Sequence, residues 1–285
     1  MNEPVDRHFE SSRLKLHYVV WGDESKPPLL LVHGTRDHAR SWDFVAQRML
    51  DEFCVYAPDL RGHGDSEWAI GGQYSVSAFV ADLAKMVEVI HRGPVALIAH
   101  SLGGRIALDY TAAYPDKVTK LVAIEGFGRV GSEDPAIDRL HRYVDTVREL
   151  ERREPHPYAN LSEAEARMHD ANERLTPAMV THLTEHAVNR LHDDTYVWKF
   201  DNYTRLAPAP EWSPAETVEL WKQIKTPTLH IGGSDSWGKR FPDGRETMTA
   251  AVPDSRTVIV EGSGHWVHHD QLDEFVTLVR EFLLG

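Results

Sequence analysis

A buried strand that turns into a helix at a single serine is the feature that most constrains this chain. The apolar run from Pro94 to Ala99 predicts a buried strand, and a helical pattern begins directly after Ser101. A serine on so sharp a corner must adopt a strained backbone conformation, so its neighbours must be small. Ala99, Gly103 and Gly104 are such neighbours. The corner is therefore expected to lift the Ser101 hydroxyl clear of the sheet, beside free N–H groups at the helix start.

Strand and helix patterns alternate along most of the 285 residues. Uninterrupted apolar runs indicate strands that are buried on both faces, as in parallel sheets covered by helices. The helical patterns span residues 76–90 and 272–283. The alternation predicts a doubly wound α/β core, in which ligands bind at the carboxyl ends of the strands. The predicted strands are 14–20, 29–32, 53–57, 95–99, 118–124, 228–231 and 257–260.

The alternation stops between about residues 126 and 221, where helical patterns dominate and no buried strand is evident. Thr176 before Pro177 and Ser213 before Pro214 are typical helix starts within this region. We interpret 126–221 as a helical cap, or lid, inserted into a core formed by 1–125 and 222–285.

The overall composition excludes several classes of partner. There are 31 basic and 44 acidic residues, which gives a net charge of −13 and argues against nucleic acid or an anionic membrane surface as partners. No apolar run reaches the length of a membrane span, and the start of the chain has no signal-peptide pattern. A single cysteine, Cys54, fits a reducing compartment, so we expect a cytoplasmic protein. The oligomeric state stays open, with a homodimer among the alternatives.

Neither a cofactor nor a metal is expected from the motifs. The glycine-rich loop from Asp59 to Ser66 lacks the Gly-Lys-Ser/Thr signature of phosphate-binding loops, so a structural role is expected for it. His192, Asp193 and Asp194 do not have the spacing of metal ligands.

Ser101 and His265 are the candidate nucleophile and base. Nucleophilic attack by a serine requires a base that removes its proton. The chain has 17 histidines, but His265 follows the last predicted strand in a loop with Gly262 and Gly264, and it lies C-terminal to the serine and to the candidate acids. His268, in the same loop, is more typical of loop structure or surface.

Two carboxylates are candidates for the acid that would orient His265. Asp235 directly follows the strand 228–231, and we favour it. Glu125 ends the preceding core strand and is the alternative acid. Either side chain could fix the imidazole tautomer and stabilise the imidazolium.

The remaining candidates surround this group. The backbone N–H groups of Leu102 and Thr35 are expected to form an oxyanion hole. Trp198 and Tyr203, in the cap, are candidates for substrate binding. Arg36 lies beside Thr35 and could bind a substrate carboxylate, although we expect a structural ion pair for it.

Taken together, the ordered motifs resemble the α/β-hydrolase superfamily, and the cap resembles its serine-hydrolase-like subgroup. The resemblance implies an eight-stranded, mostly parallel sheet and an enzyme that cleaves carboxylic esters of small molecules through an acyl-enzyme intermediate. Ser101 at the nucleophile position departs from dehalogenases and epoxide hydrolases, which use aspartate. A C–C bond hydrolase, a lactonase, a lyase and a non-catalytic small-ligand receptor are the alternatives. The motifs are His33-Gly34, Asp59-x-Arg-Gly-x-Gly-x-Ser66, Ala99-His-Ser-Leu-Gly-Gly104, Gly232-x-x-Asp235 and Gly264-His-Trp-Val-His268.

Overall fold

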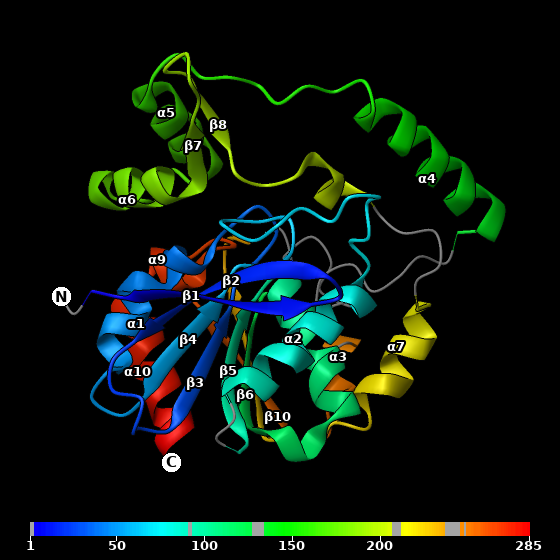
Figure 1. The fold of residues 1–285 in the computed structure, drawn as a ribbon. Helices are drawn as coiled ribbons and strands as arrows, with labels where there is room; N and C mark the ends of the chain where they lie inside the picture. The colour runs from blue at the N-terminus through cyan, green and yellow to red at the C-terminus, as the bar shows by residue number, and fades with distance from the viewer. Residues whose placement is uncertain (1–2, 91–92, 127–133, 207–211, 237–245, 248) are drawn as a thin grey trace.

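The computed structural model of the protein describes residues 3–90, 93–126, 134–206, 212–236, 246–247 and 249–285. Within these ranges the chain forms an eight-stranded sheet in the order β1-β2-β4-β3-β5-β6-β9-β10 (Figure 1). The β1–β2 and β2–β4 pairs are antiparallel and the others are parallel, which confirms the predicted sheet. The strands are β1 (Val5–Ser11), β2 (Leu14–Trp21), β3 (Pro28–Val32), β4 (Cys54–Pro58), β5 (Val95–His100), β6 (Val118–Ile124), β9 (Thr228–Gly233) and β10 (Ser255–Val260).

Helices cover both faces of this sheet (Figure 1). Leu30 and Val32 of β3 point into one apolar cluster, with side chains of α2 (Val76–Ile90) and α3 (Leu102–Ala113). Leu29 and Leu31 point into the other cluster, with side chains of α1 (Asp43–Met49) and α10 (Leu272–Leu284). Because neighbouring residues of a strand face opposite sides, a strand between two helical layers has to be apolar throughout.

The first strand, β1, has no counterpart among the predicted strands. It lies at the edge of the sheet and pairs only with β2, from Val5↔Val20 to Ser11↔Leu14. Most of its side chains are exposed, and Phe9 is its one apolar residue in the core. Because only two of its seven side chains, Val5 and Phe9, are apolar, the pattern of β1 does not stand out in the sequence.

The cap lies above the carboxyl ends of the strands (Figure 1). It contains a short hairpin as well as helices, and the sequence analysis did not predict this hairpin. Each strand of the hairpin has three residues, which is too short for a periodic pattern. None of the helices in the described ranges is long and apolar enough to cross a bilayer. The elements are α4 (Ala136–Leu150), α5 (Leu161–Ala171), α6 (Pro177–Ala187), β7 (Val188–Arg190), β8 (Tyr196–Trp198) and the 3-10 helix η3 (Asn202–Arg205).

Helix α7 (Pro214–Trp221) packs on the core, although its residues lie in the range predicted for the cap. Trp221 is fully buried, and its indole N–H donates to Asp109 of α3 across 2.7 Å. Arg105 of α3 donates to Thr217 of α7. We therefore propose that the boundary between cap and core lies before α7 rather than at residue 221.

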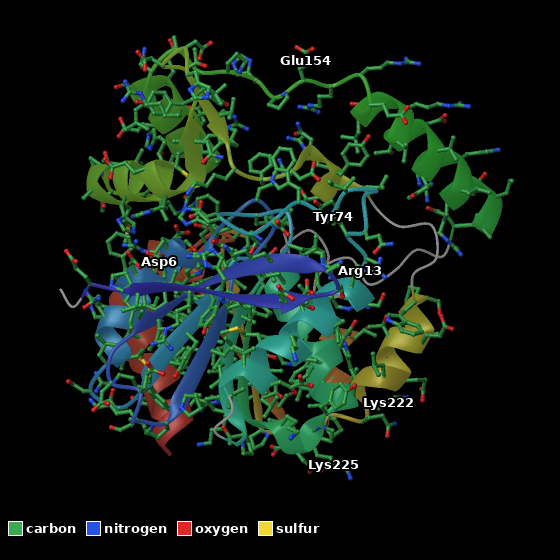
Figure 2. The ribbon with its side chains drawn as sticks, in the orientation of Figure 1. Asp6, Arg13, Tyr74, Glu154, Lys222 and Lys225 are labelled. Atoms are coloured by element: carbon green, nitrogen blue, oxygen red, sulfur yellow. The ribbon has the colours of Figure 1, made fainter. Side chains whose placement is uncertain are left out.

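Side-chain contacts join the cap to the loop that follows β4. The Tyr74 hydroxyl donates to Asp201 across 2.6 Å, and the Trp68 indole donates to the carbonyl oxygen of Lys199. Tyr74 lies where the core meets the cap in Figure 2. These contacts hold the segment leading into η3 close to the carboxyl edge of the sheet.

A buried ion pair anchors the same loop to α2. Arg61 donates to the carboxylate of Asp82 twice, across 2.6 and 2.7 Å, and both side chains are buried. Arg61 also donates to the carbonyl oxygen of Gln73. The Asp59-x-Arg-Gly motif therefore has the structural role that the sequence predicts.

Replacing Asp82 by alanine should destabilise the fold strongly, because it leaves the Arg61 guanidinium buried without its counter-ion. We expect a loss of about 3–5 kcal/mol in the free energy of unfolding, measured by chemical denaturation. Glu88→Ala is the matched control, since Glu88 pairs with Lys85 on the exposed side of the same helix. That change should cost less than about 1 kcal/mol. Equal losses in the two variants would contradict this account of the loop.

Candidate active site

Ser101 occupies the corner between β5 and α3. Its φ of 53° and ψ of −115° are strained for a residue with a side chain. Positions 103 and 104 have to be glycines, because a Cβ on Gly103 would lie 2.5 Å from the carbonyl oxygen of His33. A Cβ on Gly104 would lie 2.6 Å from Cα of Gly126. These close approaches fix the serine at the carboxyl edge of the sheet.

His265 reaches Ser101 from the loop between β10 and α9 (Val267–Asp270). Its Nε2 lies 3.0 Å from the Ser101 Oγ. The loop is held in place by Asp270, which accepts a hydrogen bond from the Gly264 N–H across 2.7 Å. The structure thus brings together the two side chains that the sequence pairs over a separation of 164 residues.

The carboxylate beside His265 belongs to Glu125. One of its oxygens lies 3.5 Å from the His265 Nδ1, and its side chain is fully buried. It accepts hydrogen bonds from the Gly233 N–H across 2.9 Å and from the Ser236 hydroxyl across 2.7 Å. Glu125 also has a positive φ, 50°, which is uncommon outside glycine. These constraints hold the carboxylate next to the imidazole.

Asp235, the acid that we favoured from the sequence, lies elsewhere. Its carboxylate pairs with Arg174 of the cap across 3.0 Å, and its side chain is 45% exposed. The turn after β9 directs Ser236 inward to Glu125 and Asp235 outward to solvent. The geometry therefore favours Glu125 over Asp235 as the acid, and the choice between them stays a prediction.

The turn after β3 runs alongside Ser101. A Cβ on Gly34 would lie 3.1 Å from the Ser101 Cβ, so the backbone of this turn approaches the serine closely. Thr35 follows directly, and Leu102 is the first residue of α3. Because the N–H groups in the first turn of a helix have no partner within the helix, the Leu102 N–H is suited to an anion. The use of Thr35 and Leu102 as an oxyanion hole stays a prediction.

The two aromatic candidates for substrate binding have structural partners. The Trp198 indole donates to the Tyr158 hydroxyl across 3.0 Å, and its ring stacks on Phe200. Tyr203 packs beside Gly72, in the loop that follows β4. Their role in substrate binding therefore stays a prediction.

Sequence reasoning missed a histidine pair behind the serine. His100 and His268 are both fully buried, with ring centroids 4.8 Å apart, and His100 lies equally close to His265. His100 Nε2 lies 2.9 Å from the carbonyl oxygen of His265, where it donates as a neutral ring. Burial lowers the pKa of both His100 and His268 well below 6.5. The proposed base therefore has neutral imidazoles, and not cations, as neighbours.

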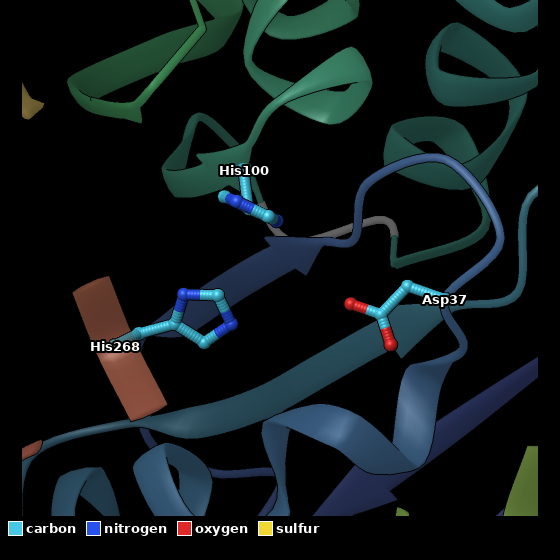
Figure 3. A group of neighbouring side chains, drawn as sticks. All are labelled: Asp37, His100 and His268. Carbon is cyan, nitrogen blue, oxygen red and sulfur yellow. The ribbon is translucent and has the colours of Figure 1, made fainter. Parts of the chain in front are cut away.

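One group of possible metal ligands includes the residue directly before Ser101. It consists of Asp37, His100 and His268 (Figure 3). Their donor atoms lie within 4.8 Å of one another, whereas donors on one tetrahedral zinc are about 3.4 Å apart. Two imidazoles and a carboxylate are ligand types that suit zinc or iron. The serine chemistry proposed below uses no metal.

Relatives and solved structures agree with this architecture. A model of the alpha/beta hydrolase family matches residues 29–278. An uncharacterized protein of Mycobacterium tuberculosis is 26% identical over 277 residues, which cover 91% of this chain and 76% of that protein. A serine hydrolase-like protein of Danio rerio is 24% identical over 282 residues, which cover 94% of this chain and 85% of that one. A thioesterase domain from the curacin biosynthetic pathway superposes with a TM-score of 0.88 at 21% identity, covering 98% of this chain and all of that domain.

The chain therefore belongs to the alpha/beta hydrolase family.

Acidification should destabilise the protein through its buried histidines. Burial lowers the pKa of His269 to about 3, and those of His100 and His268 also lie far below 6.5. Because the unfolded chain takes up protons near pH 6.5 and these folded rings do not, their contribution is complete above that pH and falls as the pH drops below it. His17 and His182, whose pKa values are raised by Asp59 and Asp43 against the effect of burial, act in the opposite sense.

His268→Phe isolates this effect, because phenylalanine can keep the stacking on Trp42, whose ring centroid is 4.5 Å away. Between about pH 7 and pH 5, the free energy of unfolding of the variant should fall less steeply than that of the wild type. Chemical denaturation at several pH values measures both slopes. Identical slopes would show that His268 is not buried as a neutral ring.

Proposed function

We propose that the protein is a serine hydrolase that cleaves carboxylic esters of small molecules through an acyl-enzyme intermediate. The 3.0 Å separation between His265 Nε2 and the Ser101 Oγ carries the proposal, because it is the distance at which an imidazole can accept the hydroxyl proton. Family membership and the relatives support hydrolysis, and we infer the ester as substrate.

In the first half-reaction, Ser101 Oγ attacks the acyl carbon while His265 Nε2 takes its proton. Glu125 faces the Nδ1 side of the ring, where a carboxylate fixes the tautomer and stabilises the imidazolium. The 3.5 Å gap is longer than a hydrogen bond and would close as the positive charge develops. The N–H groups of Thr35 and Leu102 would hold the oxyanion.

The first half-reaction ends when the imidazolium gives its proton to the leaving alkoxide, which departs as an alcohol and leaves an acyl group on Ser101. In the second half-reaction, the same groups act on water. Water, deprotonated by His265, then attacks the acyl carbon, and the acid leaves as Ser101 regains its proton. Atoms and protons balance with water as the only co-reactant.

The alternatives differ in the substrate and share the serine. A lactonase, a C–C bond hydrolase and a lyase would use the same side chains, and the thioesterase neighbour adds thioesters to the substrates that should be assayed. A non-catalytic receptor on this scaffold would bind a small molecule beneath the cap without turning it over. A panel of esters, lactones and thioesters with the purified protein separates these candidates.

Ser101→Ala should abolish hydrolysis of short p-nitrophenyl esters, with a loss in kcat on the order of 10⁴-fold or more. The fold should persist, because alanine keeps the Cβ and removes only the hydroxyl. A fluorophosphonate probe should label the wild type at Ser101 and leave the variant unlabelled, which peptide mass spectrometry can locate. Undiminished turnover by the variant would exclude Ser101 as the nucleophile, and failure of the wild type to label would favour the receptor.

Glu125→Gln and Asp235→Asn form a matched pair that identifies the acid. Glu125→Gln should lower kcat by about 10⁴-fold, because an amide can neither fix the right tautomer nor stabilise the imidazolium. Asp235→Asn breaks a half-exposed ion pair with Arg174, so its effect should stay within about tenfold. Steady-state kinetics on one p-nitrophenyl ester measures both. A larger loss in Asp235→Asn would reverse the assignment.

A further inference from the structure

Four arginines from separate segments approach one another near the proposed active site. We call them the arginine cluster: Arg36 follows the turn after β3, Arg153 follows α4, Arg167 lies on α5 and Arg205 ends η3. Several other arginines in the described ranges are paired, as Arg61 is with Asp82. Within the described ranges, the structure gives no ion pair and no side-chain hydrogen bond to any member of the cluster. The ion pair expected for Arg36 is thus not found among these residues.

The members of the cluster act on one another electrostatically. Burial, and then the charges of Arg167 and Arg153, lower the pKa of Arg36. Burial also lowers the pKa of Arg205, followed by Arg36 and Arg153, while Glu149 raises it. Like charges that lie close together repel, so the cluster destabilises the folded protein in the absence of an anion. Such a concentration of positive charge stands out in a chain with a net charge of −13.

The cluster extends from the proposed oxyanion turn to the cap. Arg36 is adjacent to Thr35, and its positive φ of 60° is a strained conformation for a residue other than glycine. The 3-10 helix that ends at Arg205 contacts α4. Beside the end of α4 lies an open hollow of about 650 Å³, lined by Arg153 together with Asp145, Arg148, Glu149 and Arg152. The cluster therefore connects the turn beside Ser101, through Arg36, with the hollow at the end of α4, through Arg153.

We propose that the arginine cluster binds an oxyanion of the substrate, a carboxylate or a phosphate, so that the preferred ester or thioester is an anion. Guanidinium groups bind such groups through paired N–H donors, and these charge-assisted hydrogen bonds are the strong ones. The proposal rests on the proposed function and narrows its substrate class. An anionic substrate would not be expected from the net charge of −13 alone.

The carboxylate arm of the test compares p-nitrophenyl hemiadipate with p-nitrophenyl hexanoate, two esters of equal chain length of which only the first ends in a carboxylate. The wild type should prefer the hemiadipate in kcat/KM by about tenfold or more, mainly through KM. Raising the ionic strength should reduce this preference. Arg36→Gln and Arg167→Gln should each lower the hemiadipate-to-hexanoate ratio by about tenfold.

Arg190→Gln is the control variant. Arg190 lies on β7 of the cap and pairs with Asp194 across 2.8 Å, outside the cluster. Its removal should leave the substrate ratio unchanged. Arg36→Gln could also change the substrate ratio by disturbing the oxyanion turn. Arg167→Gln tests the cluster without this local effect, because α5 lies apart from that turn in the sequence and carries no proposed catalytic group.

The phosphate arm compares acetyl-coenzyme A with the acetyl thioester of N-acetylcysteamine, which keeps the thioester and lacks the phosphates. If the wild type prefers the coenzyme A thioester and this preference falls in Arg36→Gln and Arg167→Gln, the cluster binds phosphate. If the preference for the hemiadipate falls in these two variants instead, the cluster binds carboxylate. The absence of any preference for either anion, with neutral substrates turned over normally, overturns the proposal while the proposed function stands.

If no substrate is turned over, the proposed function fails and the cluster is tested by binding alone. Isothermal titration calorimetry with adipate and with inorganic phosphate should then show binding that weakens in Arg36→Gln and Arg167→Gln and persists in Arg190→Gln. Failure of both anions to bind the wild type would overturn the proposal.

Discussion

The strained corner at Ser101 is the constraint on which the rest of the site depends. A φ of 53° is energetically unfavourable for a residue with a Cβ, so the packing of the surrounding residues has to impose this conformation. Gly103 lies against the end of β3, and Gly104 lies against Gly126 after β6. Three neighbouring strands thus meet at one point, and their ends bring the proposed oxyanion turn, the proposed nucleophile and Glu125 together.

The charge pattern around this corner has two parts. Behind the serine, burial keeps His100 and His268 neutral, so the positive charge that would develop on His265 in the proposed mechanism is not opposed by a neighbouring imidazolium. Toward the cap, arginines without ion-pair partners among the described residues supply positive charge. In the proposed mechanism, the first part would favour proton transfer at any ester, whereas the second would select which ester binds.

Much of the core could be predicted because its signals are local. Strands buried on both faces are continuous apolar runs, and the strand–serine–helix corner needs small residues at fixed positions, so β3, β5 and Ser101 could be read directly from the sequence. His265 could be found from its order in the chain. Edge strand β1 and the hairpin β7–β8 were missed, because a mostly exposed strand and two three-residue strands carry almost no periodicity.

The acid and the arginine cluster depend on tertiary contacts that a sequence does not display. Asp235 and Glu125 both follow core strands, and only the direction of the turn after β9 decides which carboxylate faces His265. The same turn brings in Ser236, for which the sequence carried no signal. From the sequence, Arg36 could either form a structural ion pair or bind a substrate carboxylate. The choice depends on whether a carboxylate of the protein lies near it, and the charges that act on it are those of arginines from the cap.

A crystal structure of the protein after reaction with a fluorophosphonate tests the central claim most directly, because the covalent adduct resembles the tetrahedral intermediate. The account predicts phosphorus bonded to the Ser101 Oγ, the phosphonyl oxygen within hydrogen-bond distance of the Thr35 and Leu102 N–H groups, and the Glu125 carboxylate hydrogen-bonded to His265 Nδ1. An adduct in which His265 has turned away from the serine, or in which Asp235 holds the imidazole and Glu125 does not, would contradict it.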